Sequence, residues 1–182
     1  MNTISITKAY GSKVYEATAF VHTIYLEKFG TSPAISDTYI IAHRDKSIIG
    51  ALGIDFADTH GRLPYEKIYR TDISTHPLPT QKETSIQFGK WVHAARDQSL
   101  SACLGYAGCL YALSYSKKHM WSIHTDGAAR LLKQKGVDLF CIHDAVLHTE
   151  AISKDDIDYY TQIPQPKCYV SEIQQISQAL FV

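Results

Sequence analysis

Three residues near the middle of the chain could accept a proton in catalysis. They are Glu66, in the short helical pattern LPYEKIYR, then Glu83, and His93 at the end of the apolar run TSIQFGKWVHA. Carboxylates and imidazoles are the side chains that most often transfer protons in enzymes. The alternatives are a solvated helix glutamate for Glu66 and a half-buried structural histidine for His93. Residue type and position therefore predict candidates for acid–base chemistry near this run.

A glycine interrupts the same run. Gly89 in a strand-like pattern is typical of a β-bulge, or of a backbone that a ligand approaches closely. The alternative is a glycine that only avoids crowding with neighbouring side chains and has no role toward a ligand. Alternation along a strand would place Phe88 and Trp91 on opposite faces, so we expect one of them to line a ligand pocket and the other to lie in the core.

Polar residues then open a long helical pattern over residues 97–119. The unpaired amides and the positive dipole end at a helix start favour a phosphate group. The candidates for binding it are Arg96, Gln98, Ser99 and Ser101. An ordinary helix cap is the alternative.

Charge and metal-ligand spacing exclude several other classes of function. Lys plus Arg and Asp plus Glu are both 18, so no bulk basic field favours nucleic acid, although a local basic patch is possible. The four cysteines form no CxxC pair and the nine histidines form no HxxxH or HExxH. We therefore expect no metal site, and reduced cysteines with a structural role.

Length and composition predict one ordinary globular domain over residues 1–182. Hydrophobic residues make up 45% and charged residues 20% of the chain. No run approaches the roughly 18 apolar residues of a membrane helix, and the start lacks the pattern of a signal peptide, so we expect a cytoplasmic protein without a membrane span.

The predicted elements alternate along the chain. A strand in ISITKAY, with Ser12 as a helix cap, precedes a helix over residues 13–29. A hairpin over residues 37–58 follows, in which Gly50 and Gly53 indicate a bulge or close approach. A long excursion with the short helix LPYEKIYR leads to the strand with Gly89. The remaining predicted segments are a buried helix of about six turns over residues 97–119, a strand MWSIHT, a helix over 126–136, a strand over 137–147, a polar tail and a final short helix or strand over 171–182.

This order predicts an α/β (α+β) domain whose central mixed sheet is flanked by helices, with an antiparallel N-terminal half and βαβ units in the C-terminal half. It resembles the GNAT acyltransferase fold. The spacing N-x-x-A-x-x-L-Y-x-x-x-G-F of that fold is similar to a pattern here formed by Thr125, Ala128, Leu131, Leu132, Gly136 and Val137. Leu132 replaces the tyrosine that serves many members as a general acid. The glycine-rich donor loop of many acetyl-CoA members is also absent from residues 96–102.

Glycine-poor loops at this place occur in acyl-homoserine-lactone synthases and N-acyl amino acid synthases, and the chain resembles the neighbouring thermostable haemolysin family most. The matching residues are Leu63, Glu66, Tyr69, Ile86, Gly89, Thr125, Gly136, Tyr159, Tyr160 and Pro164. Gln87 stands where the family strand has a glutamate, and an amide cannot accept a proton as a carboxylate does.

The resemblance implies transfer of an acyl group from an acyl thioester to a small-molecule amine. It implies no tightly bound cofactor, a donor that is either acyl-CoA or an acyl carrier protein, and a donor site between the strands that end near Gly89 and Thr125. Gln87 is the third candidate at the catalytic position, with Glu66 and His93. Basic residues that could dock an acyl carrier protein, or simply be solvated, are Lys117, Lys118, Arg130, Lys133 and Lys135. The alternative is a catalytically degenerate GNAT-like protein that binds a ligand or partner.

Overall fold

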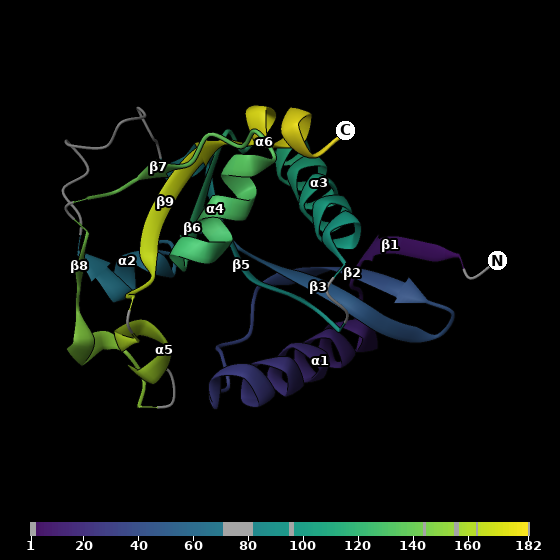
Figure 1. Cartoon of the computed structure of the whole chain (residues 1–182), viewed down its shortest axis with the longest axis horizontal. Helices are drawn as coiled ribbons and strands as arrows, with labels where there is room; N and C mark the ends of the chain where they lie inside the picture. The colour runs from purple at the N-terminus through teal and green to yellow at the C-terminus, as the bar shows by residue number, and fades with distance from the viewer. Residues whose placement is uncertain are drawn as a thin grey trace.

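A mixed sheet forms the centre of the molecule (Figure 1). The computed structural model describes residues 3–70, 82–94, 97–143, 145–154, 157–162 and 164–181. In these residues the sheet has seven strands in the order β1, β2, β3, β5, β6, β9, β7. Their bounds are Ile4–Lys8 (β1), Thr38–Arg44 (β2), Ser47–Asp55 (β3), Ser85–His93 (β5), His119–His124 (β6), Lys167–Glu172 (β9) and Phe140–Cys141 (β7). A second sheet pairs β4, Tyr69–Arg70, with β8, Val146–Leu147.

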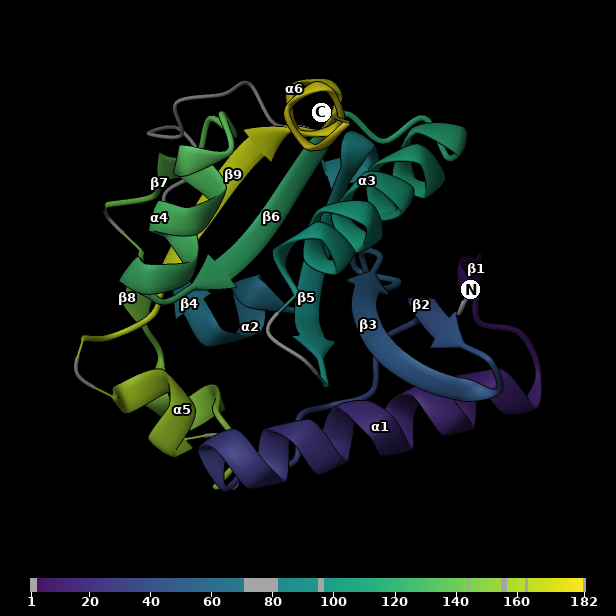
Figure 2. The same cartoon turned by 45° about the vertical axis from the view of Figure 1, so that its right-hand side comes forward.

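Helices cover both faces of the large sheet (Figure 2). The helix α1 (Ser12–Phe29) lies on one face, and α3 (Gln98–Ser114), α4 (Asp126–Gln134) and α6 (Ile173–Leu180) lie on the other. The short helix α2 (Tyr65–Ile68) packs against Trp121 of β6 on the sheet face opposite α3, and the short helix α5 (Ile157–Thr161) contacts the end of α1. Two 3-10 turns span Lys82–Thr84 and Thr149–Ala151. The predicted mixed sheet flanked by helices is confirmed.

Two layers of apolar side chains hold the helices to the sheet. On the α1 face, Ala17 and Val21 pack against Ile41 and Ala51. On the other face, residues of α3 and α6 such as Leu104 pack in a larger cluster on β3 and β5. Because the central strands are buried on both faces, they read as nearly continuous apolar runs in the sequence.

The expected helix over residues 13–29 is confirmed, but two details near helix ends were wrong. Ser12 is the first helical residue and not the cap, because Gly11 occupies the cap position with a φ of 53° and no side-chain bond. The long helix α3 ends at Ser114, since Ser116 adopts a positive φ and β6 begins at His119. One face of α3 is buried, while Leu110 and Leu113 are exposed on the other.

The C-terminal part of the sheet differs more from the prediction. The expected strand over residues 137–147 is wrong as one element, since β7 and β8 belong to different sheets. The polar tail contains β9, which pairs antiparallel with both β6 and β7. β9 therefore lies between β6 and β7, and β5, α3 and β6 form the one βαβ unit with paired strands among the described residues. Prolines before Lys167 hid this strand, since proline normally marks a break.

Candidate functional site

The parallel strands β5 and β6 pair over only part of their length. Ser85, Ile86 and Gln87 pair with residues 119–121, and beyond this point no register joins the two strands in the described structure. β5 continues beside β3 as far as His93, and β6 continues beside β9 as far as His124. Figure 2 shows the two strands diverging after they pair. Beyond Gln87, the backbone N–H and C=O groups on the facing edges of β5 and β6 therefore do not bond each other, which is unusual in the interior of a sheet.

A bulge in β5 lies at the start of this separation. Gly53 is opposite Gly89, but Ala51 is opposite Val92, so β5 has one residue more than β3 between these pairs. Lys90, within the bulge, has a φ of 51°. The bulge expected near Gly50, Gly53 and Gly89 is confirmed. A Cβ atom at Gly89 would have no heavy atom within 4 Å, so Gly89 borders open space.

The bulge also changes the direction of Trp91. Phe88 is 2% exposed and belongs to the cluster under α3, and Trp91 packs against that same cluster, with its ring beside Gly105. The prediction that Phe88 and Trp91 lie on opposite faces was therefore wrong. An extra residue between them shifts the alternation by one position.

Three buried polar atoms without partners flank the separation. They are Trp91 Nε1 on β5, and Ser122 Oγ and His124 Nε2 on β6, and none has a hydrogen-bond partner among the described residues. Trp121 and Ile123 pack in the cluster on the α2 side, so alternation places Ser122 and His124 on the opposite face, with Trp91. Buried polar atoms are nearly always hydrogen-bonded, so these three atoms could bind a ligand group or water.

The sequence prediction missed Ser122 and His124. The signal that could have identified them is their alternation with Trp121 and Ile123 in the strand MWSIHT, which places a hydroxyl and an imidazole on the helix-covered face.

The imidazole of His124 is neutral at pH 7, because burial lowers its pKa to about 4 from the ordinary 6.5. The unfolded chain gains a proton on His124 as the pH falls below its ordinary pKa, whereas the folded protein does not until near pH 4. The free energy of unfolding should therefore fall by about 1–2 kcal/mol between pH 7 and about pH 5 from this group. Urea unfolding of wild type and His124→Gln at both pH values measures it.

The variant should lose less stability than wild type on acidification. Burial also lowers the pKa of His119, but that contribution is the same in both proteins. Equal losses in wild type and variant would contradict the shift at His124.

The structure brings Glu66 and Gln87 close together, and each accepts a hydrogen bond from a backbone amide near the start of α2. The Oε1 atom of Gln87 accepts a 2.7 Å hydrogen bond from the Tyr65 amide, and Glu66 Oε2 accepts one of 2.7 Å from the Leu63 amide. Both side chains therefore hold the start of α2.

His93 lies opposite Gly50 at the other end of β5, about 20 Å along the strand from Gln87 at ~3.3 Å per residue.

The predicted phosphate site at the start of α3 contains an internal carboxylate. Asp97 caps the helix, and its Oδ1 atom accepts hydrogen bonds from the amides of Ser99 and Leu100 at 2.9 and 3.0 Å. The Ser101 amide donates to the Asp97 carbonyl, and Gln98 and Ser99 are exposed. Arg96 lies outside the described residues. Thr125 caps α4 and accepts a bond from the Ala128 amide.

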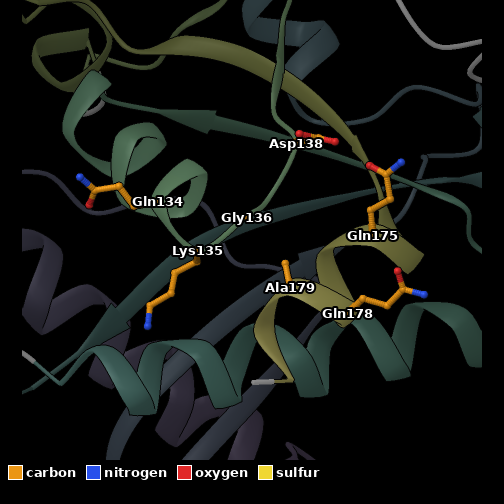
Figure 3. Close-up of a pocket in the computed structure, with 7 residues that line it drawn as sticks. All are labelled: Gln134, Lys135, Gly136, Asp138, Gln175, Gln178 and Ala179. Atoms are coloured by element: carbon orange, nitrogen blue, oxygen red, sulfur yellow. The ribbon is translucent and has the colours of Figure 1, made fainter.

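A polar hollow lies elsewhere, between α4 and α6 (Figure 3). Its lining residues are Gln134, Lys135, Gly136, Asp138, Gln175, Gln178 and Ala179. α6 begins directly after β9, whose last residue pairs with the first residue of β6. The hollow is therefore at the end where β6 starts, away from the direction in which β5 and β6 separate.

Three further observations concern metal ligands, membrane spans and cysteines. The described residues contain no group of three or more His, Cys, Asp or Glu that could hold a metal ion. Within the same residues, no helix combines the length and apolar character that crossing a membrane requires. All four cysteines are free thiols.

Three features define the fold. In the described residues the mixed sheet has one parallel pair of strands, which separates, the first strand of that pair has a bulge, and a helix crosses between the two strands. The chain has a GNAT-like acyltransferase fold.

Solved structures with this fold match over nearly the whole chain. The acyl-homoserine-lactone synthase LasI has a TM-score of 0.66 at 12% identity, over 100% of this chain and 96% of LasI. BjaI, a CoA-dependent acyl-homoserine-lactone synthase solved with SAM and isopentyl-CoA, has a TM-score of 0.63 at 12% identity, over 99% and 88%. A putative N-acetyltransferase from Lactobacillus plantarum has a TM-score of 0.61 at 13% identity, over 94% and 99%. At these identities the likeness shows the fold.

Comparison by sequence finds no matching protein-family model and no matching curated protein. The resemblance to the thermostable haemolysin family therefore stays a prediction.

Proposed function

We propose that this protein transfers an acyl group from an acyl thioester to an amine, with the thioester arm bound between β5 and β6. The observation that carries the proposal is the separation of these strands beside three buried polar atoms that have no hydrogen-bond partner in the described part of the chain, Trp91 Nε1, Ser122 Oγ and His124 Nε2. An acyl-thioester arm is a narrow chain with amide groups, so it could pair with strand edges and with these atoms. Gly89 borders open space at the start of the separation.

In the proposed reaction the amine nitrogen attacks the thioester carbonyl, a C–N bond forms, and the C–S bond breaks. The nitrogen loses a proton, and the thiolate leaves and takes one up. Backbone amides near the bulge would stabilise the oxyanion, and binding both substrates side by side would supply much of the rate enhancement.

His124 is our candidate for donating a hydrogen bond to the leaving sulfur, which then takes up through solvent the proton that the amine nitrogen loses. Leu132, at the position of the family tyrosine, has no group that can do so. A neutral imidazole can donate from Nε2 in one tautomer, and the buried Nε2 of His124 has no partner among the described residues. Glu66 and His93 remain candidates for removing the proton from the amine.

The hydrogen bonds at the start of α3 bear on which thioester is the donor, acyl-CoA or an acyl carrier protein. The Asp97 carboxylate already accepts from the amides there, so a phosphate group at this place would meet a negative charge. We infer that recognition rests on the acyl and pantetheine portions, which acyl-CoA and an acyl carrier protein share. Arg130, Lys133 and Lys135 are exposed on and after α4 and could contact an acidic carrier protein, whereas Lys117 already donates to the Glu83 carbonyl.

The decisive experiment incubates the protein with acyl-CoA and acyl-carrier-protein donors of short, medium and long chains, in the presence of pooled amines. Thiol release and mass spectrometry of the acylated product are the two measurements. The exposed thiol of Cys103 reacts with thiol reagents, so its signal is subtracted with a donor-free control. We expect thiol release that depends on the amine. No release and no thermal shift with any donor would contradict the proposal.

A degenerate protein that only binds its ligand is the second candidate, and Gln87 favours it. Its amide stands where the resembling family has a carboxylate, and it is 7% exposed and bonded to the Tyr65 amide. If Gln87 serves only to hold α2, Gln87→Glu should leave the transfer rate unchanged or lower, because a glutamate oxygen can still accept from Tyr65. A rise of about 100-fold or more in that rate would favour a lost catalytic carboxylate.

A further inference from the structure

Lys90 adopts a backbone conformation that side chains other than glycine seldom take. Its φ is 51°, in the bulge of β5. The left-handed region costs such a residue about 1–2 kcal/mol. The Lys90 side chain is nevertheless only 14% exposed, so it folds against the protein and does not extend into solvent. Contacts of this side chain must therefore hold the bulge.

These contacts form a buried network on the sheet face that α1 covers. Lys90 Nζ donates to Ser36 Oγ at 2.7 Å and to Asp55 Oδ2 at 3.3 Å. Ser36 Oγ donates to Asp55 Oδ2 at 3.2 Å, and the Asp37 amide donates to Asp55 Oδ1 at 3.1 Å. Ser36 and Asp55 are each 4% exposed. The network ties the bulge to the segment before β2 and to the end of β3.

Gly53 makes room for this network. A Cβ atom there would lie 2.3 Å from Ser36 Oγ and 3.2 Å from the Gly89 carbonyl oxygen. The glycine, the serine and the bulge therefore form one packed unit beneath the point where β5 leaves β6.

A buried ion pair is a weak source of stability, because removing both charges from water costs about as much as their attraction returns. Well-packed apolar residues would hold the sheet as firmly. The pair instead fixes the orientation of the Lys90 side chain, since its ammonium has to reach Ser36 Oγ and Asp55 Oδ2.

We propose that Lys90, Asp55 and Ser36 are positioning residues, which hold the bulge of β5 and so present the Gly89 peptide to the donor thioester. The identity of the bound ligand rests on the proposed function. The anchoring of the bulge does not, so the two can fail separately.

The test compares Lys90→Met, Lys90→Gly and Lys90→Arg with the double variant Lys90→Met/Asp55→Asn. Lys90→Gly permits the positive φ but removes the ammonium, and the double variant removes both charges so that neither is left buried alone. The measurements are amide hydrogen exchange across residues 86–93, donor KM and kcat, and the urea unfolding midpoint.

We expect exchange in the bulge to rise about tenfold in Lys90→Met, Lys90→Gly and the double variant, and less in Lys90→Arg. Donor KM should rise about tenfold in the same three variants, while the double variant keeps an unfolding midpoint close to that of wild type. Unchanged exchange in Lys90→Gly, or a wild-type KM in the double variant, would overturn the proposal. If wild type transfers no acyl group, the proposed function fails, and hydrogen exchange still decides whether Lys90 anchors the bulge.

Discussion

Gly89→Leu is expected to lower kcat/KM for acyl transfer at least about 100-fold while the protein stays folded. A Cβ atom at Gly89 meets nothing within 4 Å, and the backbone there does not require glycine, so the fold should accept a side chain. The leucine would extend into the open space beside the strand separation, where we place the thioester. Steady-state kinetics with the best donor, together with circular dichroism and the urea unfolding midpoint, measure the effect.

Gly127→Leu is the matched control. Gly127 is an exposed residue that also has nothing within 4 Å of a Cβ atom, but it belongs to α4 and not to the bulged strand β5. It should change neither kcat/KM nor donor binding. Wild-type kinetics in Gly89→Leu would show that the donor does not pass this strand. If wild type proves inactive, donor-induced thermal shift replaces the kinetic measurement for both variants.

Gly53→Val is expected to lower the free energy of unfolding by about 3 kcal/mol. The new Cβ atom would lie 2.3 Å from Ser36 Oγ and 3.2 Å from the Gly89 carbonyl oxygen, and the second contact is with backbone that cannot rotate away. Either the strands separate or Ser36 moves away from Asp55, which leaves a buried carboxylate with one bond fewer. Chemical denaturation gives the loss directly.

Adding Ser36→Ala to Gly53→Val removes the closest contact and keeps the backbone contact. The double variant should therefore regain part, but not all, of the lost stability. A valine variant as stable as wild type would mean that β3 and β5 do not approach at Gly53 as the structure has them.

Local patterns in the sequence predicted much of the fold around this site. The helix over residues 13–29, the strand with Gly89 and the strand before Thr125 all follow from periodicity and from the glycines that end or interrupt the runs. The bulge followed from glycines in paired strands. These features depend on residues close in sequence, so one sequence is sufficient to find them.

The candidate site was only partly predictable. Gly89 borders open space as expected for a residue near a ligand, and Glu66 and Gln87 do lie together. The amides expected to hold phosphate donate to Asp97, and His93 lies far along β5 from Gln87. A side chain's nearest partner decides whether it is free for chemistry, and composition or spacing does not reveal that partner.

The order of elements, the mixed sheet and the interruption at Gly89 follow from the amino-acid sequence alone, because hydrophobic period and glycine act locally on the backbone. Folding of the whole chain is needed to place β9 between β6 and β7, to bring Trp91 and Phe88 to one face, and to bring Lys90 to Asp55. Each of these depends on contacts between segments far apart in the chain. A single extra residue in a strand changes which face every later side chain occupies, and only the pairing of that strand with its neighbour shows where the residue is accommodated.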